Sequence, residues 1–247
     1  MEKILLEICC GSADDVIEAA RGGADRVELN SSLFLGGLTP TAGMLRVLRR
    51  QTDIPVMAMV RPRAGGFCYT DAEFETAKED ARILLENGAD GLVFGFLHKD
   101  GTVDEDRTRA LVEIAEGRPC VFHRAIDVVP DWKRALGQLI GLGVTRVLTS
   151  GQQSSALLAL DTIRKMIGYA DGAIEILPGG GIRLGNVDRV TAATGCTQVH
   201  LSGHKAVSDP SVSGNPGIHF GGALYPPEDR FSLIDRDYIS AVRGKLG

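Results

Sequence analysis

The stretch Gly-Gly-Ala-Asp-Arg-Val-Glu-Leu at 22–29 decides the fold, because a related stretch returns three times along the 247-residue chain. The related stretches are Asn-Gly-Ala-Asp-Gly-Leu-Val-Phe at 87–94, Leu-Gly-Val-Thr-Arg-Val-Leu-Thr at 142–149 and Thr-Gly-Cys-Thr-Gln-Val-His-Leu at 194–201. In each, a glycine ends a helix and turns the chain into a short apolar run. The steps of 65, 55 and 52 residues between these glycines each fit two strand–helix units, which indicates a barrel built from quarters.

Strand-sized apolar runs alternate with helical patterns along the whole chain. We expect strands at 3–9, 25–30, 55–62, 91–97, 119–125, 146–150, 173–178 and 198–202. We expect helices near 13–22, 41–51, 71–87, 104–116, 131–142, 154–169, 185–194 and 234–245, with caps at Ser12, Thr39, Thr70 and Ser154. Eight strands, each followed by a helix, predict an α/β fold: a single (β/α)8 TIM barrel with one domain over residues 1–247.

The composition argues against several classes of partner. The 27 basic and 32 acidic residues give a net charge of -5, and no long basic run is present, so nucleic acid is not an expected partner. The apolar runs are far shorter than a membrane span, and Glu7 interrupts the apolar start, which does not resemble a signal peptide. The five cysteines include no CxxC pair, which is typical of reduced thiols in a cytoplasmic protein.

A connection over 204–233, rich in Ser, Pro and Gly, separates the last expected strand from the last helix. Connections of this length are usually functional or disordered. We expect this segment to lie over the barrel mouth or to form a dimer interface, and a mobile tail is the alternative.

The faces of the expected strands follow from their charges. One face of a barrel strand points inward and the other packs beneath helices, where an unpaired charge is costly. The inward charged or titratable residues then form a ring: Glu7, Glu28, Arg61, His123, Glu175 and His200. Its carboxylates and histidines are the candidate catalytic groups. Catalytic residues in this fold come from the ends of several strands. The alternative is an ionic network that only plugs the barrel, although barrel interiors are usually filled by Val, Ile and Leu.

A second set of residues is suited to binding an anionic group. Phosphate sites in such barrels form after the last two strands, where consecutive glycines let backbone N–H groups approach an anion. The candidate substrate-binding residues are Gly179, Gly180, Gly181, Ser202, Gly203, Ser150, Arg61, Arg63 and Arg124. The plainer alternative is that these glycines serve only to turn the chain.

Two cofactors are not expected. No lysine lies at an inward strand end, so a Schiff base with a carbonyl substrate or with PLP is not predicted. No dinucleotide fingerprint is present, so NAD is not predicted either.

Several motifs follow one another along the chain: Leu-Glu-Ile-Cys-Cys at 6–10, Gly-Ala-Asp-Arg-Val-Glu-Leu at 23–29, Gly-Gly-Leu-Thr-Pro at 36–40, Arg-Pro-Arg-x-Gly-x-Phe-x-Tyr at 61–69, Phe-His-Arg-Ala-x-Asp at 122–127, Leu-Thr-Ser-Gly-Gln at 148–152 and Pro-Gly-Gly-Gly-Ile at 178–182. Together these motifs resemble those of the CutC copper homeostasis family. The resemblance covers residues 5 to about 203 in one order. It implies a cytoplasmic TIM barrel, a homodimer and a link to copper handling.

The chain departs from that family pattern at its candidate copper site. Many relatives carry a cysteine where this chain has Asn30, and that cysteine with the one corresponding to Cys9 is the suggested Cu(I) site. Cu(I) prefers thiolate ligands, so Cys9 alone is a weaker copper ligand. Leu35 and the stretch Ala64-Gly65-Gly66 replace two carboxylates of the family pattern, which gives the rim a more apolar face.

Three functions remain open from the sequence. An enzyme is favoured, because crowded carboxylates and histidines supply an acid and a base for isomerase- or lyase-type chemistry on a small polyhydroxy or phosphorylated molecule. The same groups are suited to a divalent ion such as Mg²⁺, Mn²⁺ or Zn²⁺. The alternatives are direct Cu(I) binding and trafficking without catalysis, and a barrel that only binds a metabolite.

Overall fold

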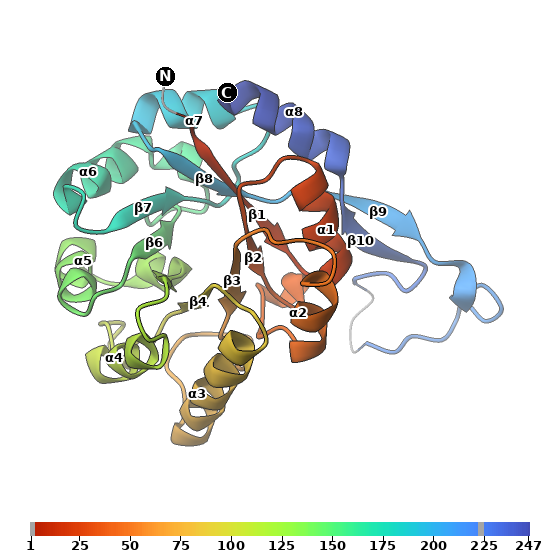
Figure 1. Ribbon diagram of the computed structural model, residues 1–247, viewed down its shortest axis with the longest axis horizontal. Helices are drawn as coiled ribbons and strands as arrows, with labels where there is room; N and C mark the ends of the chain where they lie inside the picture. Colours follow the sequence, from red (N-terminus) through yellow and green to blue (C-terminus); the bar gives the residue numbers. More distant parts are fainter. Residues whose placement is uncertain (1–2, 222–224) are drawn as a thin grey trace.

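Eight parallel strands, each followed along the chain by a helix, form a nearly closed barrel (Figure 1). The structure is a computed structural model that describes residues 3–221 and 225–247. The barrel strands are β1 (Leu5–Cys10), β2 (Arg26–Leu29), β3 (Val56–Met59), β4 (Gly91–Phe94), β5 (Cys120–Phe122), β6 (Arg146–Thr149), β7 (Glu175–Pro178) and β8 (Gln198–Leu201). The helices are α1 (Ala13–Arg21), α2 (Ala42–Leu48), α3 (Asp71–Glu86), α4 (Glu105–Ile114), α5 (Trp132–Gly141), α6 (Leu160–Ala170), α7 (Val187–Thr194) and α8 (Arg236–Leu246). The predicted fold class is confirmed.

The hydrogen-bonded order of the strands is β7-β6-β5-β4-β3-β2-β1-β8. Within the described residues no backbone ladder joins β7 to β8, so the barrel has a seam there. A side chain crosses the seam instead, since Gln198 Nε2 on β8 donates to Glu175 Oε2 on β7 at 3.0 Å. The strands flanking this seam are therefore held mainly by their other neighbours.

Two of the four predicted helix caps are confirmed. The Ser12 hydroxyl accepts the Asp15 N–H, and Thr70 forms a reciprocal capping box with Glu73. Thr41 rather than Thr39 caps α2, because the Thr39 hydroxyl accepts the Arg61 N–H and fixes the end of β3. The prediction at Ser154 is also wrong, because a short 3-10 helix, η3 (Ala156–Leu158), comes before α6.

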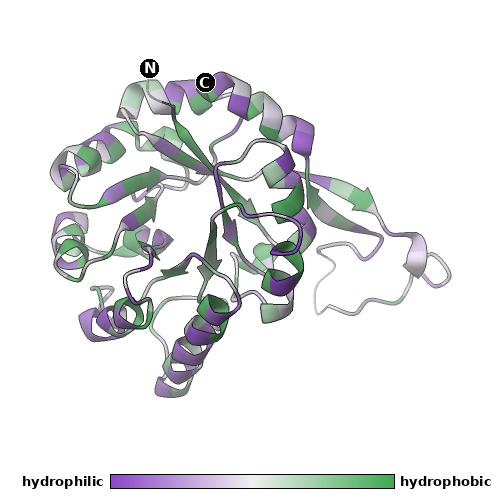
Figure 2. Cartoon of the chain, in the orientation of Figure 1, coloured by the Kyte–Doolittle hydropathy of each residue, from purple (hydrophilic) through white to green (hydrophobic). Residues whose placement is uncertain are grey.

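Two hydrophobic clusters occupy the two faces of the strands. The larger lies between the strands and the surrounding helices and includes Leu6, Ile8, Val27 and Val199. Figure 2 shows the corresponding hydrophobic residues on the strands and on helix faces turned toward them. The smaller cluster fills the barrel interior and consists of Met57, Met59, Val93, Val121, Leu148 and Leu177. This separation agrees with the faces that strand parity predicts.

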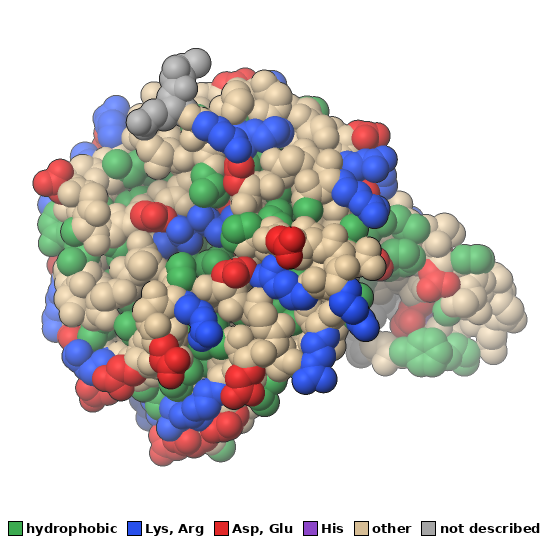
Figure 3. All heavy atoms as spheres, in the orientation of Figure 1, with side chains coloured by type: hydrophobic (Ala, Val, Ile, Leu, Met, Phe, Trp, Pro, Cys, Tyr) green, Lys and Arg blue, Asp and Glu red, His purple; other side chains and the backbone are tan. Residues whose placement is uncertain are grey.

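The connection after β8 is an arm that leaves the side of the barrel (Figure 1). Strands β9 (His204–Ser208) and β10 (Arg230–Ile234) pair antiparallel at its base, and η4 (Pro210–Val212) follows β9. Figure 3 shows hydrophobic side chains gathered on this arm, where Ile218, Phe220, Tyr225 and Phe231 are exposed. Among the described residues of 204–233 only His204 lines the cavity at the mouth, so this part of the arm does not cover it. A role in dimer formation stays a prediction.

Over the described ranges, every helix is too short or too polar to span a lipid bilayer.

Candidate functional site

A cavity of about 960 Å³ opens at the mouth of the barrel. We call it the mouth cavity, and its chemically reactive lining comprises Cys9, Glu28, Arg61, His123, Arg124 and His200. Of the other predicted binding residues, Gly180, Gly181, Ser202 and Gly203 also line it. The structure therefore brings ten of the predicted site residues around one cavity. Five others lie elsewhere: Glu7, Arg63, Ser150, Glu175 and Gly179.

Glu7 and Glu175 belong to a polar layer deeper in the barrel. In this lower layer Glu7 pairs with Arg26, Arg26 Nη2 donates to Gln198 Oε1 at 2.8 Å, and Arg146 pairs with Glu175 at 2.6 Å. Glu175 is the first residue of β7, and its side chain is 53% exposed. Strand parity predicted the inward face of Glu175 correctly, but parity does not tell how far along the barrel axis a residue lies. Because Glu175 begins β7, it lies at the opposite end of the strand from the mouth cavity.

Arg63 also stays away from the cavity, because loop groups occupy its guanidinium. Its Nε donates to Glu73 at 2.6 Å, and its other nitrogens donate to the carbonyls of Ala64, Gly66 and Cys68. Arg61 lines the cavity, but loop carbonyl groups also occupy most of its guanidinium N–H groups. It donates to the carbonyls of Leu35, Gly37 and Gly65 at 2.8–3.0 Å, and its Nε has no partner. Arg61 therefore joins the rim loops and leaves one N–H free.

A compact group at the ends of β1, β2 and β8 contains Cys9, Glu28, Asn30 and His200. Asn30 Nδ2 donates to Glu28 Oε2 at 2.8 Å, and Cys9 Sγ lies 3.7 Å from the same oxygen. The other Glu28 oxygen, Oε1, and Asn30 Oδ1 are buried without a partner. His200 Nδ1 lies 2.8 Å from Glu7 Oε1, so Glu7 fixes the orientation of the imidazole from below.

The charges of this group are set by burial and by one another. Burial opposes ionisation of Glu7, but the hydrogen bond from His200 and the charge of Arg26 outweigh it and lower the pKa of Glu7 to about 2. Burial raises the pKa of Glu28 above its usual value. Burial disfavours protonated His200, yet Glu28 and the bonds to Cys9 and Glu7 raise its pKa well above the usual value. Neutral pH therefore combines a cationic imidazole with a carboxyl group of raised pKa.

His123 follows β5 and has a different environment. Its Nδ1 accepts the Ala125 N–H at 3.2 Å, and its Nε2 is buried without a partner. The ring lies 4.8 Å from the Phe67 ring, measured between centroids. Burial and the nearby charge of Arg61 lower the pKa of His123 to about 3, so the imidazole is neutral at physiological pH.

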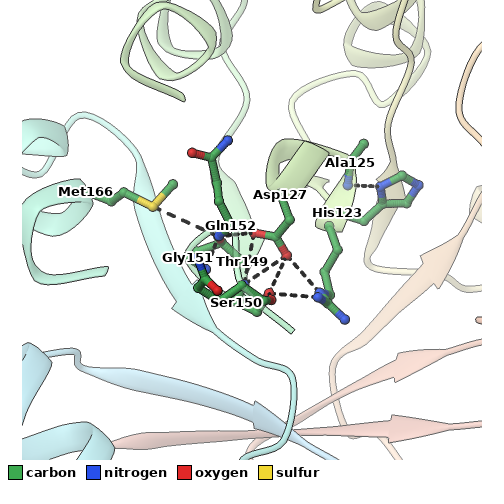
Figure 4. Close-up of polar contacts among 10 residues, drawn as sticks. His123, Ala125, Asp127, Thr149, Ser150, Gly151, Gln152 and Met166 are labelled. Atoms are coloured by element: carbon green, nitrogen blue, oxygen red, sulfur yellow. Dashed lines mark hydrogen bonds and ion pairs between the residues drawn. The ribbon is translucent and has the colours of Figure 1, made fainter. Parts of the chain in front are cut away.

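Asp127 is a central residue of the site that the sequence analysis did not select. It accepts hydrogen bonds from the hydroxyl groups of Thr149 and Ser150, the N–H groups of Ser150 and Gln152, and Arg124 Nε (Figure 4). Arg124 Nη2 also donates to the Ser150 hydroxyl at 2.7 Å. Ser150 thus positions Arg124 and does not line the cavity. The only available signal was the acidic residue three positions after Arg124 in Phe-His-Arg-Ala-Ile-Asp.

The glycines after β7 divide into two roles. A Cβ at Gly179 would lie 2.6 Å from Leu148 Cδ1, so Gly179 permits close packing and does not line the cavity. Gly180 and Gly181 have φ of +88° and +74° and do line it. A Cβ at Gly180 would lie 3.6 Å from Arg124 Nη1, so the positioned guanidinium stands beside the glycine backbone. This pair is the part of the site best suited to an anionic group.

A family model described as "CutC family" matches residues 4–205. The chain belongs to the CutC family. It is 54% identical over 242 residues to a CutC family protein of Treponema denticola, covering 98% of both chains. It is 42% identical over 231 residues to a human protein named copper homeostasis protein cutC homolog, covering 94% of this chain and 85% of that protein. The crystal structure of a CutC protein from Streptococcus agalactiae has a TM-score of 0.75 at 34% identity, covering 80% of this chain and 97% of that one.

The residues around Cys9 do not fit the paired-thiol copper site that the CutC resemblance implies. Asn30 stands where the second cysteine is expected, and its Nδ2 lies 3.6 Å from Cys9 Sγ. In the described part of the chain, the one group of three metal-ligating side chains is Cys9, Glu28 and His200, whose donor atoms lie within 4.8 Å of one another. One sulfur, one oxygen and one nitrogen suit a borderline divalent ion such as Zn²⁺ better than Cu(I).

Proposed function

We propose that the mouth cavity is the active site of an enzyme that transfers protons on a small polyhydroxy or phosphorylated substrate. The observation that carries this proposal is a set of four buried polar atoms without partners, all on residues that line the cavity: Glu28 Oε1, Asn30 Oδ1, Arg61 Nε and His123 Nε2. Buried polar groups in proteins are normally hydrogen-bonded. A ligand with several hydroxyl or carbonyl groups supplies the missing donors and acceptors.

Glu28 and His200 are the proposed base and acid. Burial moves the pKa of Glu28 toward neutral pH, and a general base is most effective when its pKa lies near the working pH. Glu7 holds His200 through Nδ1, and the raised pKa of His200 keeps its imidazole protonated. His200 can therefore donate a proton to the substrate. Neighbouring groups whose environments set different protonation states are typical of acid–base sites.

Arg124 and the backbone at Gly180 and Gly181 are the proposed subsite for a phosphate or other anionic group. Asp127 and Ser150 hold the Arg124 side chain, which is still 45% exposed. Phosphate sites after the seventh and eighth strands are common in this fold. Ser202 and Gly203, which follow β8, complete the same side of the cavity.

The test is solvent deuterium exchange, followed by NMR, with a panel of small metabolites. The panel contains dihydroxyacetone phosphate, erythrose 4-phosphate, ribose 5-phosphate, ribulose 5-phosphate, gluconate and 6-phosphogluconate. We expect carbon-bound protons of at least one member to exchange with the wild-type protein. Glu28→Gln should lower that rate by about 10²–10⁴. Binding of a panel member without exchange supports a metabolite-binding barrel instead.

A second candidate function is divalent metal binding through Cys9, Glu28 and His200. The proximity of their donor atoms supports it, as does the Glu7–His200 contact, because metal-binding histidines usually donate their other N–H to a carboxylate. Competition titrations with Zn²⁺, Mn²⁺ and Cu(I) test it. We expect one Zn²⁺ per chain and loss of that binding in Cys9→Ser, with Cys68→Ser as the control because Cys68 is exposed and outside the cavity.

A further inference from the structure

The side chain of His123 is fixed in one orientation at the wall of the mouth cavity. It is 4% exposed, and its ring is flanked by the rings of Phe67 and Phe122. A Cβ at Gly95, the residue after β4, would overlap His123 Cε1 and lie 2.5 Å from Nδ1. The imidazole can therefore neither turn over nor withdraw without moving these neighbours.

The hydrogen bond to Nδ1 determines where the His123 proton lies. A backbone N–H is only a donor, so the Ala125 N–H at 3.2 Å requires a lone pair on Nδ1. The proton of the neutral ring is then on Nε2, the atom that has no partner. The charged groups that act on this ring are Arg61, which opposes a second proton, and Asp127, which favours one, and burial also opposes it.

We propose that His123 donates its Nε2–H to a substrate carbonyl oxygen, so that the substrate is an α-hydroxy carbonyl compound such as an aldose or ketose. This inference rests on the proposed function and specifies its substrate class. A neutral imidazole held by a backbone N–H is one of the groups that isomerases use to polarise a carbonyl. No lysine lines the cavity among the described residues, so an iminium ion does not replace this donor.

The proton transfer balances without any further reactant. The Glu28 carboxylate removes a proton from the carbon next to the carbonyl, and the C–H electron pair forms the C=C bond of an enediolate. The carbonyl oxygen takes up the negative charge, and the His123 Nε2–H stabilises it. Return of a proton to the neighbouring carbon, with proton exchange between the two oxygens, gives the isomeric carbonyl compound. No oxidant, reductant or leaving group is involved.

The first test measures the His123 tautomer in the wild-type protein by NMR with ¹⁵N-labelled histidine. We expect one neutral imidazole with the proton on Nε2 and no titration between pH 5 and 9. Assignment comes from the signal that is absent in His123→Gln. A proton on Nδ1, or titration near pH 6–7, overturns the proposal whether or not the variant folds.

The second test uses the deuterium-exchange panel. We expect exchange with the aldose and ketose phosphates and none with gluconate or 6-phosphogluconate, which have no aldehyde or ketone group. His123→Gln should lower kcat by about 10²–10³ with KM changed less than about threefold, as for removal of an oxyanion donor. Exchange with the aldonic acids alone, or an unchanged kcat in His123→Gln, overturns this inference and leaves the proposed function standing. No exchange with any member overturns both.

Discussion

The barrel interior contains two polar levels that use similar residue types in different ways. In the lower layer, Glu7 and Glu175 lie against Arg26, Arg146 and Gln198, and one of these side-chain atoms, Arg146 Nη1, lacks a partner. At the mouth, four buried atoms on residues lining the cavity lack one. The lower layer is thus the ionic plug that the sequence left open as an alternative, and the mouth is the candidate site. The two interpretations thus concern different heights of one barrel, and a catalytic role for the residues at the mouth stays a prediction.

Removing a charge from the lower layer should have the largest effect on stability. Glu7→Gln leaves Arg26 and His200 without their buried carboxylate, and breaking such a pair costs about 3–5 kcal/mol of unfolding free energy. Urea unfolding measures it. Glu175→Gln is the control, because the half-exposed Glu175 side chain should contribute less than about 1 kcal/mol. In the mouth, Glu28→Gln should leave stability unchanged or slightly higher; a loss comparable to Glu7→Gln would remove the distinction between the two levels.

Acid should act on the two levels in opposite directions. The folded-state pKa of Glu7 is lowered from 4.5 to about 2, so its stabilisation is present above pH 4.5 and is lost as the pH falls toward 2. This shift corresponds to about 3 kcal/mol. The pKa of Glu28 is raised, so its protonation favours the folded state as the pH falls. Unfolding free energies at pH 7, 4.5 and 3 should decline less steeply in Glu7→Gln and more steeply in Glu28→Gln than in the wild type.

A matched pair of glycine substitutions should separate strain from site geometry. Gly37 and Gly117 both have φ of +83°, so alanine at either position costs about 1–2 kcal/mol in backbone conformation. A Cβ at Gly37 would overlap Asn30 Oδ1, whereas nothing lies within 4 Å at Gly117. Only Gly37→Ala should therefore also reduce deuterium exchange. Equal exchange in both variants would show that the Asn30 amide is not needed in its observed position.

The smallest expected effect concerns Arg124. Arg124→Lys keeps the charge but loses the fork that bonds Asp127 and Ser150, so the affinity for inorganic phosphate should fall about fivefold, equivalent to about 1 kcal/mol. Calorimetric titration measures it. Arg164→Lys on α6 is the control, because that arginine also pairs with an aspartate three residues away but lies outside the cavity. A similar loss in the control would point to a general charge effect.

The strand faces could be predicted from the sequence because they depend on local rules. Side chains alternate along a strand, and a charge is costly beneath a helix. These two rules placed Glu28 and His200 inward, and they lie together at the mouth. The repeated Gly-containing stretch likewise marked the starts of β2, β4, β6 and β8.

What the sequence could not supply depends on where a strand begins, how a loop folds back and which distant segments meet. The height of Glu175 follows from where β7 begins, and the partners of Arg63 follow from how its own loop folds back. Asp127 gains its importance only because β6 ends beside the 3-10 helix η2 (Arg124–Val128) that carries it. No spacing along the chain encodes that meeting.

The seam between β7 and β8 gives the barrel the mechanics of a slit ring. A closed ring resists widening all the way round, whereas a slit ring opens by bending and with less force. Gly180 and Gly181 follow β7 on one side of the seam, and His200 lies on β8 on the other side. A ligand that contacts both sides would link β7 to β8 and would resist widening of the barrel at the one place where no backbone hydrogen bonds of the described residues do so.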